Sequence, residues 1–317
     1  MNSIVCTLFE GNYHFGLAGL VNSLECNEFE GDIYAGYKGQ LPPWAHEAKS
    51  GIIVLSGWKE SFTLKVSEKI NLHFLPIDTK FHLTNYKPYF MVELFNDVQI
   101  NADAVTYFDP DIIVKCKWKF FENWMSHGVS LVHEIISNDM PSTHPIRLEW
   151  ENVVRKSNKR VTRHLTSYIN GGFCGVLRNN IEFLNTWCDI TDTAIKYFKL
   201  TPDQWNHSYD RTYIFYAQDQ DALNITAMCS ESPISEMGPE AMDFINGGFT
   251  MSHAVGSPKP WRKNYMLSAL NGNPPTLTDK AYWSSTNSSL KTHDSLTLSR
   301  KHWAIKFASL LGRFYRR

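Results

Sequence analysis

The stretch AVTYFDPDIIV, residues 104–114, decides the fold class predicted for this chain. Its apolar run Ala104–Phe108 has the length and composition of a buried strand, and it ends abruptly in the acidic turn Asp109-Pro110-Asp111. In open α/β sheets, ligands bind at the edge formed by the carboxyl ends of the strands. The acidic turn is therefore expected at the ligand-binding edge of such a sheet.

Short apolar runs alternate with helical patterns around this stretch, which predicts a mixed, mainly parallel α/β sheet flanked by helices. Further strands are expected at Ile4–Phe9, Ile33–Tyr37, Ile52–Leu55, Val129–His133 and Gly175–Leu177. Helices are expected at Gly16–Cys26, at Pro88–Asn96, from about Ile181, and around Thr212–Met228. The polar stretch from Ser137 to Thr166 is expected to leave the sheet.

The composition argues against several classes of protein. The 31 Lys and Arg residues against 32 Asp and Glu residues give no reason to expect a nucleic-acid partner. The six cysteines lack the paired spacing of a zinc or redox site, so we expect free, buried thiols in a reducing cytoplasm. The apolar start Ile4–Phe9 is interrupted by Glu10 too early for a signal peptide or a membrane span.

Two motifs suggest chemistry. Asp109 and Asp111 can offer carboxylate oxygens to one hard divalent cation. This spacing is common, and Asp219-Gln220-Asp221 repeats it, so a solvated acidic turn is the alternative. The loop HAVGSPKPW, residues 253–261, adds an imidazole, a glycine that permits close backbone approach and a lysine suited to phosphate. Its alternative is an ordinary surface loop.

The segments TYFDPDIIV, YINGGFCGVLRNN, QDQDALN and HAVGSPKPW, in this order, resemble the retaining GT-A glycosyltransferases of family 8. That family includes glycogenin and bacterial lipooligosaccharide galactosyltransferases. The resemblance spans about Ile4 to Trp261 and implies a Rossmann-like GT-A fold, a bound Mn²⁺ or Mg²⁺, and a UDP-sugar as co-substrate. Residues 1–265 are accordingly expected to form a nucleotide-sugar-dependent catalytic domain.

The resemblance also implies a role for each matched residue. Asp109, Asp111 and His253 would bind the metal. Asp219 and Gln220 would be the catalytic pair near the anomeric carbon, with Asp219 holding sugar hydroxyls. The implied donor-binding residues are Thr7, Asn12, Tyr13, Lys87, Asn170, Gly171, Gly172, Gly256 and Lys259.

The expected function is transfer of a hexose from a UDP-sugar to a glycan or lipid-linked acceptor in bacterial surface polysaccharide or lipopolysaccharide synthesis. Neither Asp219 nor Gln220 is a convincing nucleophile, which favours retention by front-side displacement. An inverting enzyme remains open, with Glu134, Asp139 or Glu149 as its base. The motifs are also compatible with a sugar nucleotidyltransferase and, more remotely, with an inactive, membrane-attached carbohydrate-binding subunit.

The carboxyl-terminal part divides into two segments. Residues 266–298 are rich in Asn, Pro, Ser and Thr, which indicates an irregular linker or wrap. Residues 299–317 carry six Lys and Arg and no acidic residue, leaving 25 basic residues against 32 acidic ones in the rest of the chain. Their apolar residues recur at helical spacing, namely Trp303, Phe307, Leu310, Leu311 and Phe314.

This pattern predicts a basic amphipathic helix that holds a cytoplasmic protein on the anionic inner face of the cell membrane. The alternative is a helix packed against the main domain, with its charges in solvent. Deletion of Arg300–Arg317 is expected to release the protein from anionic liposomes and to leave donor hydrolysis intact.

Overall fold

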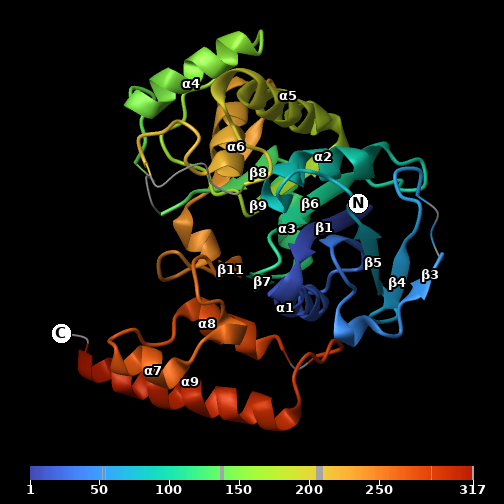
Figure 1. Ribbon diagram of the computed structural model, residues 1–317, viewed down its shortest axis with the longest axis vertical. Helices are drawn as coiled ribbons and strands as arrows, with labels where there is room; N and C mark the ends of the chain where they lie inside the picture. Colours follow the sequence, from blue (N-terminus) through green and yellow to red (C-terminus); the bar gives the residue numbers. More distant parts are fainter. Residues whose placement is uncertain (52, 54, 136–138, 205–209, 287, 316–317) are drawn as a thin grey trace.

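A nine-stranded sheet forms the centre of the part of the chain that the structure describes (Figure 1). The structure is a computed structural model that describes residues 1–51, 53, 55–135, 139–204, 210–286 and 288–315. The strand order is β10-β8-β9-β6-β1-β2-β5-β4-β3. The strands are β1 (Ser3–Glu10), β2 (Gly31–Lys38), β3 (Lys49–Ser50), β4 (Phe62–Lys65), β5 (Ile70–Pro76), β6 (Ala104–Phe108), β8 (Val129–Val132), β9 (Phe173–Leu177) and β10 (Ile234–Met237).

The predicted mixed, mainly parallel arrangement is confirmed. Strands β6, β1, β2 and β5 run parallel, with Ser3 opposite Ala104 and Val5 opposite Ile33. Strand β9 runs antiparallel to its neighbours β6 and β8. The carboxyl ends of β1, β6 and β8 therefore share one edge with the amino end of β9, and the loops at this edge come from distant parts of the chain.

Helices cover both faces of this sheet (Figure 1). Along β1, Val5 and Phe9 belong to the core beneath α1 and α3, whereas Cys6 and Leu8 belong to the core beneath α2, α5 and α6. This alternation is the period of two that a strand buried on both faces requires. The helices are α1 (His14–Cys26), α2 (Leu83–Asn96), α3 (Trp118–Met125), α4 (Pro145–Lys156), α5 (Ile181–Phe198) and α6 (Gln218–Cys229).

Some elements differ from their predicted positions. In the strand expected at Ile52–Leu55, residues 52 and 54 lie outside the described residues, and Ile53 and Leu55 are not in a strand. Strands β4 and β5 instead carry the sheet onward from β2. Helix α6 begins at Gln218 rather than near Thr212, because residues 212–217 form turns. The polar stretch that leaves the sheet contains α4.

The described residues of the carboxyl-terminal part form three α-helices, α7 (Tyr265–Leu270), α8 (Leu277–Ser284) and α9 (Ser295–Tyr315), seen at the bottom of Figure 1. Helix α8 lies within the segment expected to be irregular and begins with a capping box formed by Thr276 and Asp279. The Asn22 side chain in α1 donates to the carbonyls of Ser285 and Leu290 and ties this segment to the sheet domain. Among the described residues, no helix is long and apolar enough to span a membrane.

Candidate metal centre

The acidic turn and His253 meet because two short strands pair beside the main sheet. Asp109 follows β6, and its backbone N–H donates to the Gly172 carbonyl at 2.7 Å. Strand β7 (Ile112–Val114), directly after the turn, pairs antiparallel with β11 (Met251–His253), and His253 lies opposite Ile112. This pairing brings a histidine from late in the sequence to Asp109 and Asp111, as the motifs predicted.

Three ligand atoms converge at this point. His253 Nε2 lies 3.7 Å from Asp109 Oδ2 and 3.4 Å from Asp111 Oδ1. Asp109, Asp111 and His253 can each offer one atom such that all three atoms lie within 4.8 Å of one another. Two carboxylate oxygens and one imidazole suit Mn²⁺ well and Mg²⁺ acceptably, so the residues fit a divalent cation.

The outer oxygens of both aspartates are held by neighbouring groups. Asp109 Oδ1 accepts a hydrogen bond from the Tyr107 hydroxyl at 2.9 Å and lies 3.0 Å from Lys87 Nζ. Asp111 Oδ2 lies 2.5 Å from Lys259 Nζ. Burial alone would raise the pKa of Asp111, but His253 and Lys259 hold that pKa below its ordinary value. Such outer contacts orient the carboxylates, so that their inner oxygens face His253.

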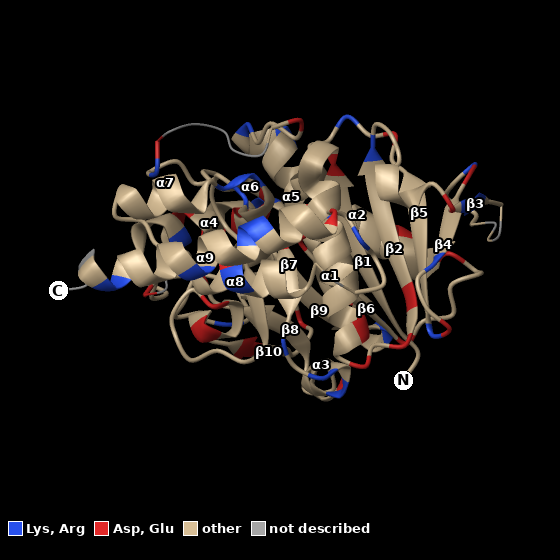
Figure 2. Cartoon of the chain, turned by 90° about the horizontal axis from the view of Figure 1, so that it is seen from below, with Lys and Arg blue, Asp and Glu red and all other residues tan. Residues whose placement is uncertain are grey.

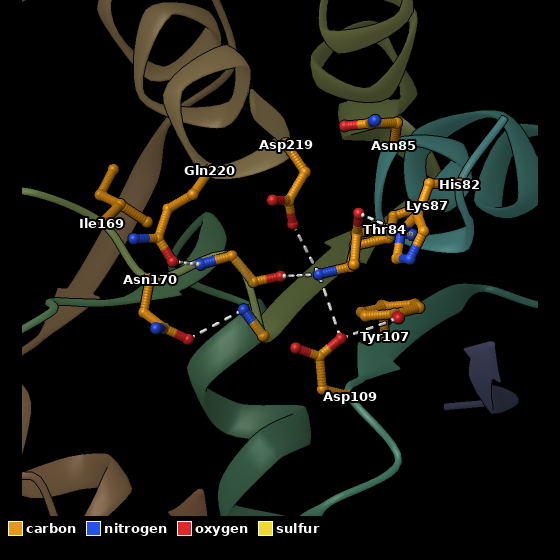
Figure 3. A network of polar contacts seen from close by, with 12 residues as sticks. His82, Thr84, Asn85, Lys87, Tyr107, Asp109, Ile169, Asn170, Asp219 and Gln220 are labelled. Carbon is orange, nitrogen blue, oxygen red and sulfur yellow. Dashed lines mark hydrogen bonds and ion pairs between the residues drawn. The ribbon is translucent and has the colours of Figure 1, made fainter. Parts of the chain in front are cut away.

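The predicted catalytic pair lies beside this centre, at the start of α6 (Figure 3). Asp219 Oδ2 accepts a hydrogen bond from Lys87 Nζ at 2.8 Å. Gln220 Oε1 accepts one from the Gly171 N–H at 2.7 Å. A Cβ atom on Gly171 would lie 3.0 Å from Asp219 Oδ2, so the absent side chain allows this close packing. The structure thus brings Gly171 together with the catalytic candidates.

Asn170 makes two hydrogen bonds within the chain, and its donor contact stays a prediction. Its side-chain amide donates to Glu134 Oε2 at 2.6 Å, and its Oδ1 accepts from the Gly172 N–H at 2.8 Å. Sequence reasoning missed this bond to Glu134 and the Tyr107 bond to Asp109. Tyr107 lies two residues before Asp109, at the spacing of one strand face, which is the signal that could have indicated its contact.

Of the remaining predicted donor-binding residues, Tyr13, Asn12 and Gly256 lie in turns or loops, whereas Thr7 is buried in a strand. Tyr13 lies beside the loop of residues 253–261. The centroid of its ring lies 5.5 Å from Lys259 Nζ and 5.8 Å from the centroid of the Trp261 ring. Asn12 is exposed in the same amino-terminal turn, and Gly256 adopts φ +79°, which glycine accommodates readily. Thr7 instead lies inside β1 with no exposed surface. Donor contacts by these residues remain predictions.

Comparisons with known proteins support the same architecture. No protein-family model matches the sequence, and no curated protein matches it. Among solved structures, the chain is similar to the apo bifunctional glycosyltransferase WbbM, with 13% identity, TM-score 0.53, and coverage of 94% of this chain and 51% of WbbM. It is also similar to the galactosyltransferase LgtC in complex with donor and acceptor sugar analogs, with 14% identity, TM-score 0.53, and coverage of 94% and 99%.

A third match is the glycosyltransferase GlyE of Streptococcus pneumoniae TIGR4, with 13% identity, TM-score 0.50, and coverage of 96% of this chain and 64% of GlyE. The chain has the GT-A fold. The chain spans about half the length of WbbM and nearly all of LgtC. At these identities the GT-A comparison establishes the architecture, so the activity has to be argued from the side chains.

Gly172 has no room for a side chain in this GT-A site. A Cβ atom there would lie 2.4 Å from the His253 ring and 2.9 Å from Asn170 Oδ1. We expect Gly172→Ala to displace His253, to weaken Mn²⁺ binding about tenfold or more, and to reduce stability by about 1–3 kcal/mol. Isothermal titration with Mn²⁺ and thermal melting test this.

Gly57→Ala is the matched control, because a Cβ atom on Gly57 meets nothing within 4 Å. The control should bind Mn²⁺ like the wild type. Wild-type Mn²⁺ affinity in Gly172→Ala would show that His253 is not a ligand or that it tolerates displacement.

Proposed function

We propose that this chain is a metal-dependent hexosyltransferase that moves a hexose from a UDP-sugar to a glycan or lipid-linked acceptor, with retention of anomeric configuration. The observation that carries the proposal is the convergence of Asp109, Asp111 and His253, with Lys259 bonded to Asp111 and Asp219 linked to Asp109 through Lys87. If the acidic turn were merely solvated, no function would account for the buried histidine and the charged side chains that meet there. The GT-A architecture supports the same assignment.

Each group has a chemical task in this proposal. When bound, Mn²⁺ or Mg²⁺ would supply positive charge that offsets the charge developing on the departing diphosphate. Lys259, with 16% of its side chain exposed, borders the site beside Tyr13 and would bind a phosphate oxygen. Tyr13 would stack on the uracil ring. Asp219 would accept hydrogen bonds from sugar hydroxyls, since one bond from Lys87 leaves acceptor capacity on its carboxylate.

Retention by front-side displacement fits the hydrogen bonds of the other candidates. The Gln220 oxygen already accepts from the Gly171 N–H, which makes it a poor nucleophile. Both oxygens of Glu134 also accept hydrogen bonds, from Ile135 N–H and from Asn170, so this carboxylate is a poor inverting base. The acceptor hydroxyl would then attack from the leaving-group side and pass its proton to a diphosphate oxygen.

Donor hydrolysis and product stereochemistry test this function. UDP-glucose, UDP-galactose and their N-acetyl forms are incubated with Mn²⁺ and then with EDTA, and UDP release is measured. We expect release from at least one donor with Mn²⁺ and none with EDTA, and NMR of the transfer product should show the donor's anomeric configuration. Release of a sugar 1-phosphate would favour nucleotidyl chemistry, and no turnover of any donor would favour a binding subunit. An inverted product would favour a base-catalysed inverting enzyme.

We also propose that α9 places the protein on an anionic membrane surface, which would present it to a lipid-linked acceptor in bacterial surface glycan synthesis. Leu298, Ile305 and Ala308 pack inward with α7 and α8. A second apolar stripe faces solvent and consists of Leu296, Trp303, Phe307, Leu310 and Phe314, each at least 50% exposed. Arg300, Lys306 and Arg313 flank this stripe, and Figure 2 shows Lys and Arg without acidic residues along α9.

The outward stripe allows a cleaner test of membrane binding than deletion of the tail. Burying Leu298 and Ile305 stabilises the fold by roughly 1.5–3 kcal/mol each, so removal of residues 300–317 would also expose core. We expect Phe307→Asp to weaken binding to phosphatidylglycerol-containing vesicles about tenfold or more, since one buried aromatic ring contributes more than about 1.4 kcal/mol. Vesicle co-sedimentation measures this.

Val98→Asp is the control, because Val98 is 81% exposed and lies outside this stripe. The control should bind vesicles like the wild type, and raised salt should weaken binding of both proteins. Equal affinity for neutral and anionic vesicles, or unchanged binding of Phe307→Asp, would contradict the proposed surface.

A further inference from the structure

We propose that Tyr265 of α7 is a positioning residue that supports the loop of residues 253–261, here the donor loop, and places Lys259 against the diphosphate of the donor. This inference rests on the proposed function, which assigns a phosphate contact to Lys259. The Tyr265 hydroxyl donates a hydrogen bond to the Pro260 carbonyl at 2.9 Å. Because Lys259 stands directly before Pro260, this bond holds the backbone next to the point where the lysine side chain begins.

The conformation of Lys259 makes its side chain sensitive to the position of Pro260. Its backbone has φ −66° and ψ 155°, the extended conformation that a following proline favours. At the other end of the side chain, Lys259 Nζ lies 2.5 Å from Asp111 Oδ2 and donates to the Ala254 carbonyl at 2.7 Å. With the backbone restricted in this way, a displacement of Pro260 would move the ammonium away from the metal site.

Tyr265 is suited to hold the loop because its hydroxyl is buried and bonded on both sides. The residue is 1% exposed, and its hydroxyl accepts a hydrogen bond from the Trp283 indole N–H at 2.8 Å. Burial and the nearby Asp279 carboxylate raise the pKa of Tyr265, so the hydroxyl keeps its proton and remains a donor near neutral pH. A chain of two hydrogen bonds therefore runs from α8 through α7 to the donor loop, and each bond polarises the other.

The same region contains a hydrophobic core that reaches the amino-terminal turn. Trp261 and Tyr265 belong to this core together with Ile113 of β7. The Trp261 ring lies between two tyrosines, with its centroid 5.3 Å from that of Tyr282 and 5.8 Å from that of Tyr13. The carboxyl-terminal helices thus pack against the donor loop as well as bonding to it.

Helix α9 contributes to this support through its inner face (Figure 1). Lys301 Nζ donates to the Lys263 carbonyl at 2.8 Å and lies 5.5 Å from the centroid of the Tyr265 ring. His302 Nε2 lies 3.0 Å from the Trp283 carbonyl oxygen. The inner face of α9 therefore supports the donor loop, while its outer stripe can meet a membrane. Deletion of residues 300–317 would remove these contacts, so it is expected to affect donor binding as well as membrane binding.

The test is a double-mutant cycle of Tyr265→Phe and Lys259→Met, with Tyr282→Phe as the control. Tyr265→Phe removes the hydroxyl and keeps the ring in the core. Tyr282 is also 1% exposed in this core, but its hydroxyl lies 3.4 Å from the Phe15 carbonyl and from His293. Affinities for UDP and for inorganic pyrophosphate are measured by titration with saturating Mn²⁺, and KM and kcat are measured for donor hydrolysis. Thermal melting shows that each variant is folded at the titration temperature.

We expect Tyr265→Phe to weaken binding of UDP and of pyrophosphate about tenfold, because a displaced Lys259 loses a charged hydrogen bond to phosphate. KM for the donor should rise by a similar factor, while kcat stays within about threefold of wild type, since the metal remains in place. In the Lys259→Met background, Tyr265→Phe should change either affinity by less than about twofold, because Tyr265 acts through Lys259. Tyr282→Phe should keep wild-type affinities.

Three results would overturn the inference. The first is wild-type affinity for both ligands in Tyr265→Phe. The second is an equal loss of affinity in Tyr282→Phe, which would indicate general loosening of the core. The third is a cycle in which the effects of Tyr265→Phe and Lys259→Met simply multiply. A wild type that binds pyrophosphate but neither binds UDP nor hydrolyses a UDP-sugar would instead contradict the proposed function, and the pyrophosphate cycle would still decide the role of Tyr265.

Discussion

Replacing Asp111 by asparagine should lower donor turnover by about a thousandfold or more, because the metal contributes several kcal/mol of charge stabilisation at the leaving group. Asp111 presents Oδ1 toward His253 and binds Lys259 through Oδ2. An asparagine keeps the shape of the side chain but removes the charge that both a cation and Lys259 require. The predicted loss therefore concerns the electrostatics of the site rather than its packing.

UDP release with saturating donor measures this effect, and Mn²⁺ titration measures the metal affinity separately. Asp32→Asn is the control, because Asp32 pairs with His73 on β2 and β5, outside the proposed site. The control should keep turnover and Mn²⁺ affinity. Full turnover of Asp111→Asn, or of the wild type after thorough chelation, would refute the metal assignment.

The parts of the site that could be predicted are those whose chemistry is local in the sequence. Asp109 and Asp111 follow a strand run directly, and the loop of residues 253–261 carries its histidine, glycine and lysine in one segment. Each pattern suggests a chemistry from its own residues, and the acidic turn taken alone is equally compatible with a solvated turn. The alternation of strands and helices indicated that the acidic turn lies at the carboxyl edge of a parallel sheet. The meeting of the two motifs also required β7 to pair with β11, and no local pattern indicated that pairing.

The contacts of Lys87 could not be predicted in the same way. In the sequence it stands one residue before Pro88 in an apolar helix pattern, where a solvated lysine is the ordinary expectation. Its burial depends on Asp109 and Asp219, which come from β6 and α6. No local propensity encodes such a contact, because its stability arises only after three distant segments have packed together.

The carboxyl-terminal helix α9 shows a second limit of prediction from the sequence, which concerns the burial of its apolar residues. Helical spacing identified one apolar stripe, with Leu311 in the same set as Phe314. The structure divides these apolar residues between two faces of α9, since Leu311 packs against the inner core whereas Phe314 is 80% exposed. Periodicity shows that a helix has apolar residues on a face, but only the neighbouring α7 and α8 decide which of them are covered. The sequence analysis also missed α8, although its capping-box residues Thr276 and Asp279 stand three residues apart in the sequence.

Asp219→Asn should impair transfer far more than nucleotide binding, because the proposed partner of this carboxylate is the sugar and not UDP. Asp219 lies in the first turn of α6 with 14% of its side chain exposed, held on one oxygen by Lys87. Burial raises its pKa and Lys87 opposes that rise. We expect kcat to fall about a hundredfold, since losing charged hydrogen bonds that tighten in the transition state costs about 1.5–3 kcal/mol.

UDP affinity, measured by titration with saturating Mn²⁺, should change less than about threefold in Asp219→Asn. Asp221→Asn is the matched control in the same helical turn. Asp221 accepts hydrogen bonds from the Tyr168 hydroxyl at 2.6 Å and from the Ala217 N–H at 2.8 Å, and burial raises its pKa to about 8. Near neutral pH this substitution therefore exchanges one mostly uncharged group for another, and kcat should stay within about threefold of wild type. If UDP affinity collapses in Asp219→Asn while kcat at saturation is kept, Asp219 serves the nucleotide, and the sugar must be gripped by other groups.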